Sequence, residues 1–267
     1  KQFTAAAVMI LQEQDKLSTD DTLDKYYPDY KYGSDITIRN LLTMTTGLPD
    51  YLGKSDESVR ANAPQYDISE KNSAKDNHSV ILKWILSQEI DNDEKNYSYS
   101  NSDYFILGDI IEKVSGKSYE EFLKENIFEP LEMTSTTFES TEQLATGYQD
   151  IFDDEWNIYP GVAYSSTGLI SNLSDLLKWT DAITGSELLS AKSKEEMFTP
   201  YKSSFAYGLY VDDCGNYYCD AAFYRFNARI VFAQDQSEVF IAFSNYTQSN
   251  PKDVNKKLDE ILKPYLK

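Results

Sequence analysis

The segment from Phe3 to Leu11 is apolar on every side and consists largely of good helix formers. A helix of this composition is stable only when other elements cover it all round. The chain must therefore place layers on both sides of this helix, yet nothing ahead of Lys1 in the sequence supplies one of them. We expect that the sequence starts in the middle of a fold and lacks an N-terminal segment.

The charge balance limits the partners of the chain. There are 44 Asp and Glu against 25 Lys and Arg, and the formal net charge is −19. A phosphate backbone requires a basic face, so nucleic acid is not expected as a partner. The single histidine, His78, argues against a histidine-based metal centre, and we expect neither a metal ion nor a cofactor. The acidity and the 21 tyrosines favour an extracytoplasmic location, secreted or at the cell surface.

Helical patterns dominate the chain from residue 17 to about residue 159. Apolar residues at helical spacing predict helices near 78–89 and 103–114, and the second ends at Ser115-Gly116. Gly108 lies inside that second helix, where glycine costs about 1 kcal/mol relative to alanine. We therefore expect a neighbouring element to pack closely against Gly108. These segments predict a mostly helical lobe over 17–159.

The pattern changes after Gly161. A capped helix is expected at 172–183, followed by β-rich runs at 205–211, 216–219, 223–233 and 238–246. Short turns separate these runs, which is typical of an antiparallel meander, and residues 251–265 have a helical apolar face that would cover the sheet. Cys214 and Cys219 could form a hairpin disulfide or stay as free thiols, and the required Cβ geometry favours free thiols.

The predicted fold class is α/β (α+β), with an antiparallel sheet flanked by helices plus an all-helical lobe. We expect a single domain over 1–267. Residues 1–16 and 160–267 would form the α/β lobe, and residues 17–159 the helical lobe.

Lys1 is physically unusual because it stands in the first turn of a buried apolar helix. The positive end of the helix dipole and the loss of water both disfavour the ammonium form and lower the pKa of the amine. A neutral amine in a pocket can act as a general base. Lys1 is therefore either a catalytic lysine or a solvated chain end.

A series of motifs follows Lys1 in a fixed order. They are Ile36-Thr37-Ile38-Arg39-Asn40-Leu41-Leu42-Thr43, Thr45-Thr46-Gly47-Leu48-Pro49, Tyr99-Ser100-Asn101, Leu107-Gly108 and Phe128-Glu129-Pro130-Leu131-Glu132-Met133. Together with the helix that starts at Lys1, this series resembles the bacterial serine β-lactamase and penicillin-binding protein family. The class C branch, with its esterases and D-aminopeptidases, is the most similar. The resemblance implies a β-lactamase/transpeptidase-like fold.

In that family the buried helix opens with Ser-x-x-Lys, so the nucleophilic serine would lie upstream of Lys1. The resemblance implies that Tyr99 moves the proton between nucleophile and leaving group, and that Asn101 hydrogen-bonds a substrate amide. A phenol has a pKa near 10, so a phenolate at Tyr99 would need the Lys1 ammonium beside it. Alternatively, Tyr99 is a half-buried aromatic residue and Asn101 caps the next helix. Both descriptions can hold at once.

The segment 161–171 resembles the part of the family that lines the floor of the cleft, which makes Tyr164 a candidate substrate-binding residue. Ser165 and Ser166 invite assignment as nucleophiles. The sequence, however, has no Gly-x-Ser-x-Gly elbow and no histidine near them. Hydrogen bonding within a turn is the favoured role for both serines.

The third motif departs from the family, which has Lys-Thr-Gly or His-x-Gly where this chain has Cys219-Asp220-Ala221. The cation that would bind a substrate carboxylate is missing there. The resemblance still implies that these residues border the substrate, with the backbone N–H near Ala222 available to an oxyanion. Arg225 either replaces the missing cation or is a surface arginine, and the second interpretation is favoured.

The resemblance implies a serine hydrolase that acts by acyl transfer on a β-lactam, a D-amino-acid peptide or an ester. Its substrate would be a small molecule or a peptide, with peptidoglycan as one source. The intact protein would be an enzyme, whereas this chain alone lacks the expected serine. The altered third motif supports an alternative, a catalytically degenerate cleft that binds cell-wall peptide or a protein partner. The sheet should show an unpaired edge, or an upstream segment or second chain should complete it.

Overall fold

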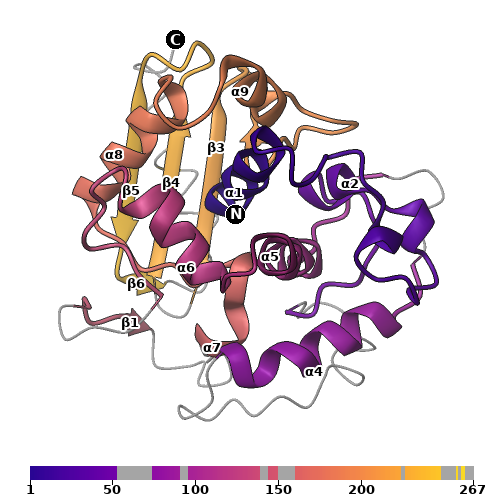
Figure 1. The fold of residues 1–267 in the computed structure, drawn as a ribbon. Helices are drawn as coiled ribbons and strands as arrows, with labels where there is room; N and C mark the ends of the chain where they lie inside the picture. Colours follow the sequence, from indigo (N-terminus) through magenta and orange to yellow (C-terminus); the bar gives the residue numbers. More distant parts are fainter. Residues whose placement is uncertain are drawn as a thin grey trace.

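The computed structural model describes residues 1–52, 74–90, 96–138, 144–149, 160–223, 226–247, 257, 260 and 261. Helix α1 (Gln2–Glu13) lies in the middle of the molecule, between a β-sheet on one side and a group of helices on the other (Figure 1). Its residues from Gln2 to Leu11 are buried, as the apolar composition predicts. The helix thus has protein on both sides, and its first turn lies at the junction of the two layers.

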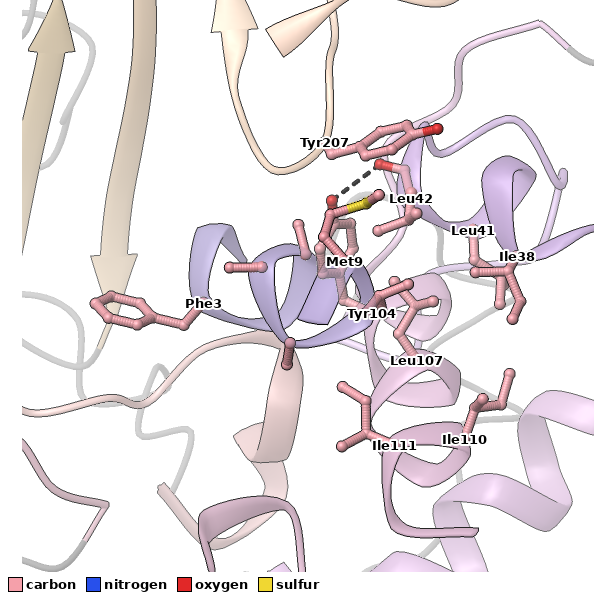
Figure 2. Close-up of a cluster of buried hydrophobic side chains, with 14 of the residues drawn as sticks. Phe3, Met9, Ile38, Leu41, Leu42, Tyr104, Leu107, Ile110, Ile111 and Tyr207 are labelled. Carbon is pink, nitrogen blue, oxygen red and sulfur yellow. Dashed lines mark hydrogen bonds between the residues drawn. The ribbon is translucent and has the colours of Figure 1, made fainter. Parts of the chain in front are cut away.

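Each side of α1 packs against a different layer. Phe3 stacks on Trp179 of helix α8 (Leu173–Thr184), with 3.9 Å between the ring centroids. Figure 2 shows Phe3 and Met9 pointing to different sides of α1. Helix α5 (Asn101–Ser115), which carries Tyr104, also contacts α1. The Tyr104 hydroxyl donates to the Leu42 carbonyl at 2.9 Å, which joins α5 to helix α2 (Ile38–Leu42).

The main sheet is an antiparallel meander in the order β2-β3-β4-β5. Its strands are β2 (Tyr210–Val211), β3 (Tyr217–Phe223), β4 (Phe226–Phe232) and β5 (Val239–Ser244). Two further short strands, β1 (Tyr148–Gln149) and β6 (Tyr246–Thr247), pair in parallel. The predicted meander is confirmed. Strand β2 is shorter than predicted because the chain turns at Gly208, which has a φ of 79°.

The other helices surround these elements. They are α4 (Ala74–Ser87), α6 (Tyr119–Leu123), α7 (Pro160–Ala163) and α9 (Ala191–Phe198), with 3-10 turns at Leu23–Lys25, Gly33–Asp35 and Tyr164–Ser166 and a π-helical turn at Lys124–Phe128. The helices predicted near 78–89, 103–114 and 172–183 are confirmed as α4, α5 and α8. Helix α9 was not predicted. The division into two lobes stays a prediction.

Gly108 is in close contact with a neighbouring segment, as the sequence predicts. A Cβ at this position would lie 2.1 Å from Ser165 Oγ and 2.6 Å from Tyr164 Cε1. Helix α5 ends at Gly116, whose φ of 73° is the left-handed conformation expected of a C′ glycine. Gly108 therefore allows the 164–166 turn to lie directly on α5, which matters for the site described below.

The sequence predicts an unpaired sheet edge or a further segment that completes the sheet. Among the described residues, β5 is the last strand of the sheet, and β3 pairs with β2 over two residues only. What completes the sheet stays a prediction, and the helix predicted at 251–265 lies outside the described residues except at positions 257, 260 and 261.

Cys214 and Cys219 are free thiols. No helix in the described ranges combines the length and apolar character needed to cross a membrane.

Candidate active site

The side chain of Lys1 lies at the junction of α1, α5 and the 164–166 turn. Its Nζ donates to Asn101 Oδ1 at 2.7 Å and to the Ser166 carbonyl oxygen at 2.7 Å. The same atom lies 5.1 Å from the ring centroid of Tyr99 and 5.6 Å from that of Tyr104. The structure thus brings together Lys1, Tyr99 and Asn101, three of the residues that the sequence singled out.

Burial changes the acid–base behaviour of the Lys1 amine. Loss of water lowers its pKa to about 8, although the neighbouring Cys219 and Asp50 act in the opposite direction. The direction is the one expected for a lysine at the start of a buried helix. At pH 7 about a tenth of such an amine is neutral, far more than for a lysine in water. Lys1 is therefore able to accept a proton near neutral pH.

The Asn101 amide connects Lys1 to a carboxylate that sequence reasoning missed. Its Nδ2 donates to both oxygens of Asp50, at 3.1 and 3.0 Å, and its Oδ1 accepts from the Tyr99 hydroxyl at 3.2 Å as well as from Lys1. Asp50 directly follows the Thr45–Pro49 motif, and this position was the available signal. The predicted cap role belongs to Ser100, and Asn101 is the first helical residue.

Tyr99 differs from the expectation in its protonation. Loss of water raises the pKa of its phenol above the ordinary value, and the neighbouring Asp50 and Cys219 raise it further. The residue keeps 44% of its surface exposed. A phenol of this kind stays protonated and donates hydrogen bonds. The surroundings therefore favour the Lys1 amine, and not a Tyr99 phenolate, as the base.

Tyr164 does not join this group of side chains. Its ring packs against the rings of Phe105 and His78, each at 4.9 Å between centroids, and of Tyr119 at 5.3 Å. This packing gives Tyr164 a structural role, and contact with a substrate stays a prediction. The next residue, Ser165, donates from Oγ to the Tyr104 carbonyl of α5 at 2.8 Å. Ser166 Oγ donates to the Ala163 carbonyl at 2.7 Å, which is the turn bonding that the sequence favours. The 164–166 turn contributes to the site through the Ser166 carbonyl.

The third motif lies on β3, beside Lys1. Cys219 is partly buried against the hydrophobic core and is close enough to Lys1 and Tyr99 to affect the pKa of both. The Asp220 carboxylate accepts from Arg229 Nη1 at 2.6 and 2.7 Å, so its charge is compensated by the neighbouring strand β4. The following residues, 221 and 222, are exposed.

Binding roles for Cys219, Asp220, Ala221 and Ala222 stay predictions, and Arg225 lies outside the described residues. Among the described residues, no group of three or more His, Cys, Asp and Glu side chains could hold a metal ion. A hollow of about 510 Å³ between α4 and α5 is lined by residues that include His78 and Asp109, not by Lys1, Tyr99 or Asn101. The candidate site is therefore separate from this hollow.

Comparisons with known proteins show which family and which fold the chain is similar to. The Beta-lactamase family profile matches residues 1–261. PbpX from Bacillus subtilis (strain 168) is 31% identical over 274 residues, which cover 98% of this chain and 64% of PbpX. The chain thus spans less than two thirds of the length of that relative.

Two solved structures share the fold. The D-amino acid amidase from Ochrobactrum anthropi SV3, complexed with D-phenylalanine, superposes with a TM-score of 0.81 at 21% identity, over 98% of this chain and 81% of the amidase. A penicillin binding protein from Bacillus halodurans gives a TM-score of 0.77 at 23% identity, over 97% of this chain and 83% of its own. The predicted fold class, with its antiparallel sheet and flanking helices, is confirmed.

Proposed function

We propose, from the premise that this chain belongs to the Beta-lactamase family, that it is the greater part of a serine hydrolase that acts by acyl transfer. The substrate would be a D-amino-acid amide, peptide or ester, or a β-lactam. One observation carries the proposal. The amine of Lys1 has a pKa lowered to about 8 and is held 2.7 Å from Asn101 Oδ1, beside the Tyr99 ring.

In this proposal the nucleophile is the serine of Ser-x-x-Lys, contributed from upstream of Lys1. As its oxygen attacks the substrate carbonyl, its proton passes to the neutral Lys1 amine. The ammonium that forms is held by the acceptors Asn101 Oδ1 and Ser166 O. The protonated Tyr99 phenol then donates to the leaving nitrogen or oxygen as its bond to the carbonyl carbon breaks, and it recovers a proton from Lys1. Water afterwards cleaves the acyl ester by the reverse route.

The test uses the protein with the residues that precede Lys1 in its gene. Treatment with a fluorophosphonate and, separately, with a fluorescent penicillin should give a serine adduct that mass spectrometry locates three residues before Lys1. The Lys1→Met variant should fold and react at least a hundredfold more slowly, because removing a general base costs about 10²–10⁴ in rate. A wild-type protein that forms no adduct with either reagent would refute the proposal.

A second candidate function is binding without turnover, and the third motif favours it. Cys219 supplies no fixed positive charge, and Asp220 is paired with Arg229. The cleft would then hold a cell-wall peptide or a protein partner. Hydrolysis of a p-nitrophenyl ester or of a D-amino-acid amide, reduced in the Tyr99→Phe variant, would exclude this alternative.

We also propose that the protein works outside the cytoplasm, with peptidoglycan fragments as one source of substrate. The acidic composition and the family membership support this location. Fractionation of cells that produce the protein would test it, since recovery in the cytoplasmic fraction alone would contradict it.

A further inference from the structure

Asp50 has no part in the proton transfers above, yet its carboxylate makes several of the contacts that build the site. Oδ1 accepts from the backbone N–H groups of Leu52 at 3.0 Å and Asn101 at 3.1 Å. Both oxygens also face Asn101 Nδ2, at 3.1 and 3.0 Å. Burial raises the pKa of Asp50, and the hydrogen bonds from Leu52 and Asn101 and the charge of Lys1 act in the opposite direction. The ionised carboxylate has only acceptors to offer, so the amide presents its NH₂ group to it.

This orientation determines what the other end of the Asn101 amide presents to the site. With Nδ2 on Asp50, Oδ1 points to the donors Lys1 Nζ and Tyr99 Oη, at 2.7 and 3.2 Å. A reversed amide would place an NH₂ group against an ammonium and its oxygen against a carboxylate, which is unfavourable at both ends. We propose that Asp50 is a positioning residue that fixes the amide of Asn101 with Oδ1 facing Lys1 and Tyr99. The effect of this amide orientation on catalysis rests on the proposed function.

Anchoring of the 46–52 loop to α5 is a competing role for Asp50. That loop, however, has other bonds to the helix. The Tyr51 N–H donates to Ser102 Oγ at 3.0 Å, and Ser102 Oγ donates to the Pro49 carbonyl at 2.6 Å. Thr46 Oγ1 also donates to Asp103 at 2.6 Å. These bonds do not involve Asp50, whereas the two contacts to Nδ2 orient the amide.

The experiment is a double-mutant cycle read from the titration of Lys1 by NMR, in protein with ¹³Cε-labelled lysine and without substrate. The groups that face Lys1 are Asp50, Tyr99, Tyr104 and Cys219. Asp50→Asn removes a negative charge and lets the amide of residue 101 reverse, and both changes lower the pKa of Lys1, together by about one pH unit. In an Asn101→Ala background only the charge effect remains, so we expect about half of that shift. Equal shifts in the two backgrounds would overturn the proposal.

A matched control is Asp175→Asn, which alters another buried carboxylate bonded to a loop, at Ser135 N and Thr136 Oγ1. It should leave the Lys1 titration unchanged, and a shift like that of Asp50→Asn would show a non-specific effect and overturn the proposal.

If Asp50→Asn does not fold, the wild-type protein decides. The Asn101 side-chain amide should show slow proton exchange and a scalar coupling to the Asp50 carboxyl carbon. Rapid exchange without coupling would overturn the proposal. None of these measurements needs turnover, so a protein without hydrolase activity would refute the proposed function and leave this inference to be judged separately.

Discussion

The contact at Gly108 gives a quantitative prediction that links packing to the site. The Gly108→Ala variant places a methyl group 2.1 Å from Ser165 Oγ, 2.5 Å from Ser165 Cβ and 2.6 Å from Tyr164 Cε1, where ordinary contacts are 3.4–4 Å. The turn must therefore move by about 1 Å. Ser165 resists this movement because its Oγ donates to Tyr104 O and its carbonyl accepts from Thr4, at 2.8 and 2.7 Å.

Overpacking of this kind lowers the free energy of unfolding by about 3 kcal/mol at the upper end of its usual range. The better helix propensity of alanine offsets about 1 kcal/mol of this loss. We expect a net loss of about 2 kcal/mol, seen as a decrease in Tm of about 4–8 °C by circular dichroism. Adding Ser165→Ala should restore part of this loss because Oγ is the closest atom. Gly116→Ala is the control, because its new methyl group meets nothing within 4 Å. Its only cost is the strain of alanine at a φ of 73°, which lowers the free energy of unfolding by about 1 kcal/mol. An unchanged or higher Tm in Gly108→Ala would refute the reasoning.

Three further predictions test the charges. Because the pKa of Lys1 is lowered to about 8 and the neutral amine is the base, kcat/KM should rise about tenfold per pH unit below that value and then level off; a flat profile would contradict this. Burial raises the pKa of Asp103 well above its ordinary value, so its carboxyl lowers stability as pH rises from about 4. Asp103→Asn, which can keep the Thr46 bond, should be at least as stable at pH 7 by urea denaturation, and a loss of stability there would be inconsistent with this pKa. Asp220→Asn removes the carboxylate from Arg229, whose side chain is 7% exposed, and should lower the free energy of unfolding in urea by about 2–4 kcal/mol. Arg229→Met leaves a partly exposed Asp220 and should lower it by less. A larger loss for Arg229→Met would argue against the buried pair.

Local sequence patterns predicted the structure correctly where a single physical effect dominates. The apolar surface of 3–11 required burial on both sides, and Gly108 required a close neighbour, and both were confirmed. The boundaries of β2 could not be predicted in the same way, because the turn at Gly208 occurs where the chain passes the backbone of Lys1 and Gln2. Helix α9 is weakly patterned, and its start depends on the Ser190 side chain accepting from the Ser193 N–H.

The site was predictable only in part, for a similar reason. Lys1, Tyr99 and Asn101 were identified from the resemblance, and the structure places them together. Asp50 was missed because its partner Asn101 lies 51 residues away, and no periodicity connects the two positions. The protonated state of Tyr99 was also missed, since it depends on burial of the phenol and on the nearby Asp50 and Cys219, which sequence order does not reveal.

The bonds of Lys1 to Asn101 and Ser166 span 100 and 165 residues of chain. Contacts of such long range form late in folding, after other contacts have compensated for the loss of chain entropy. During biosynthesis the Lys1 amine therefore stays hydrated and fully charged until the 164–166 turn has been made and docked. The growing polypeptide thus acquires its reactive amine only when both layers close around it, and a molecule that stops short of that point carries an ordinary lysine.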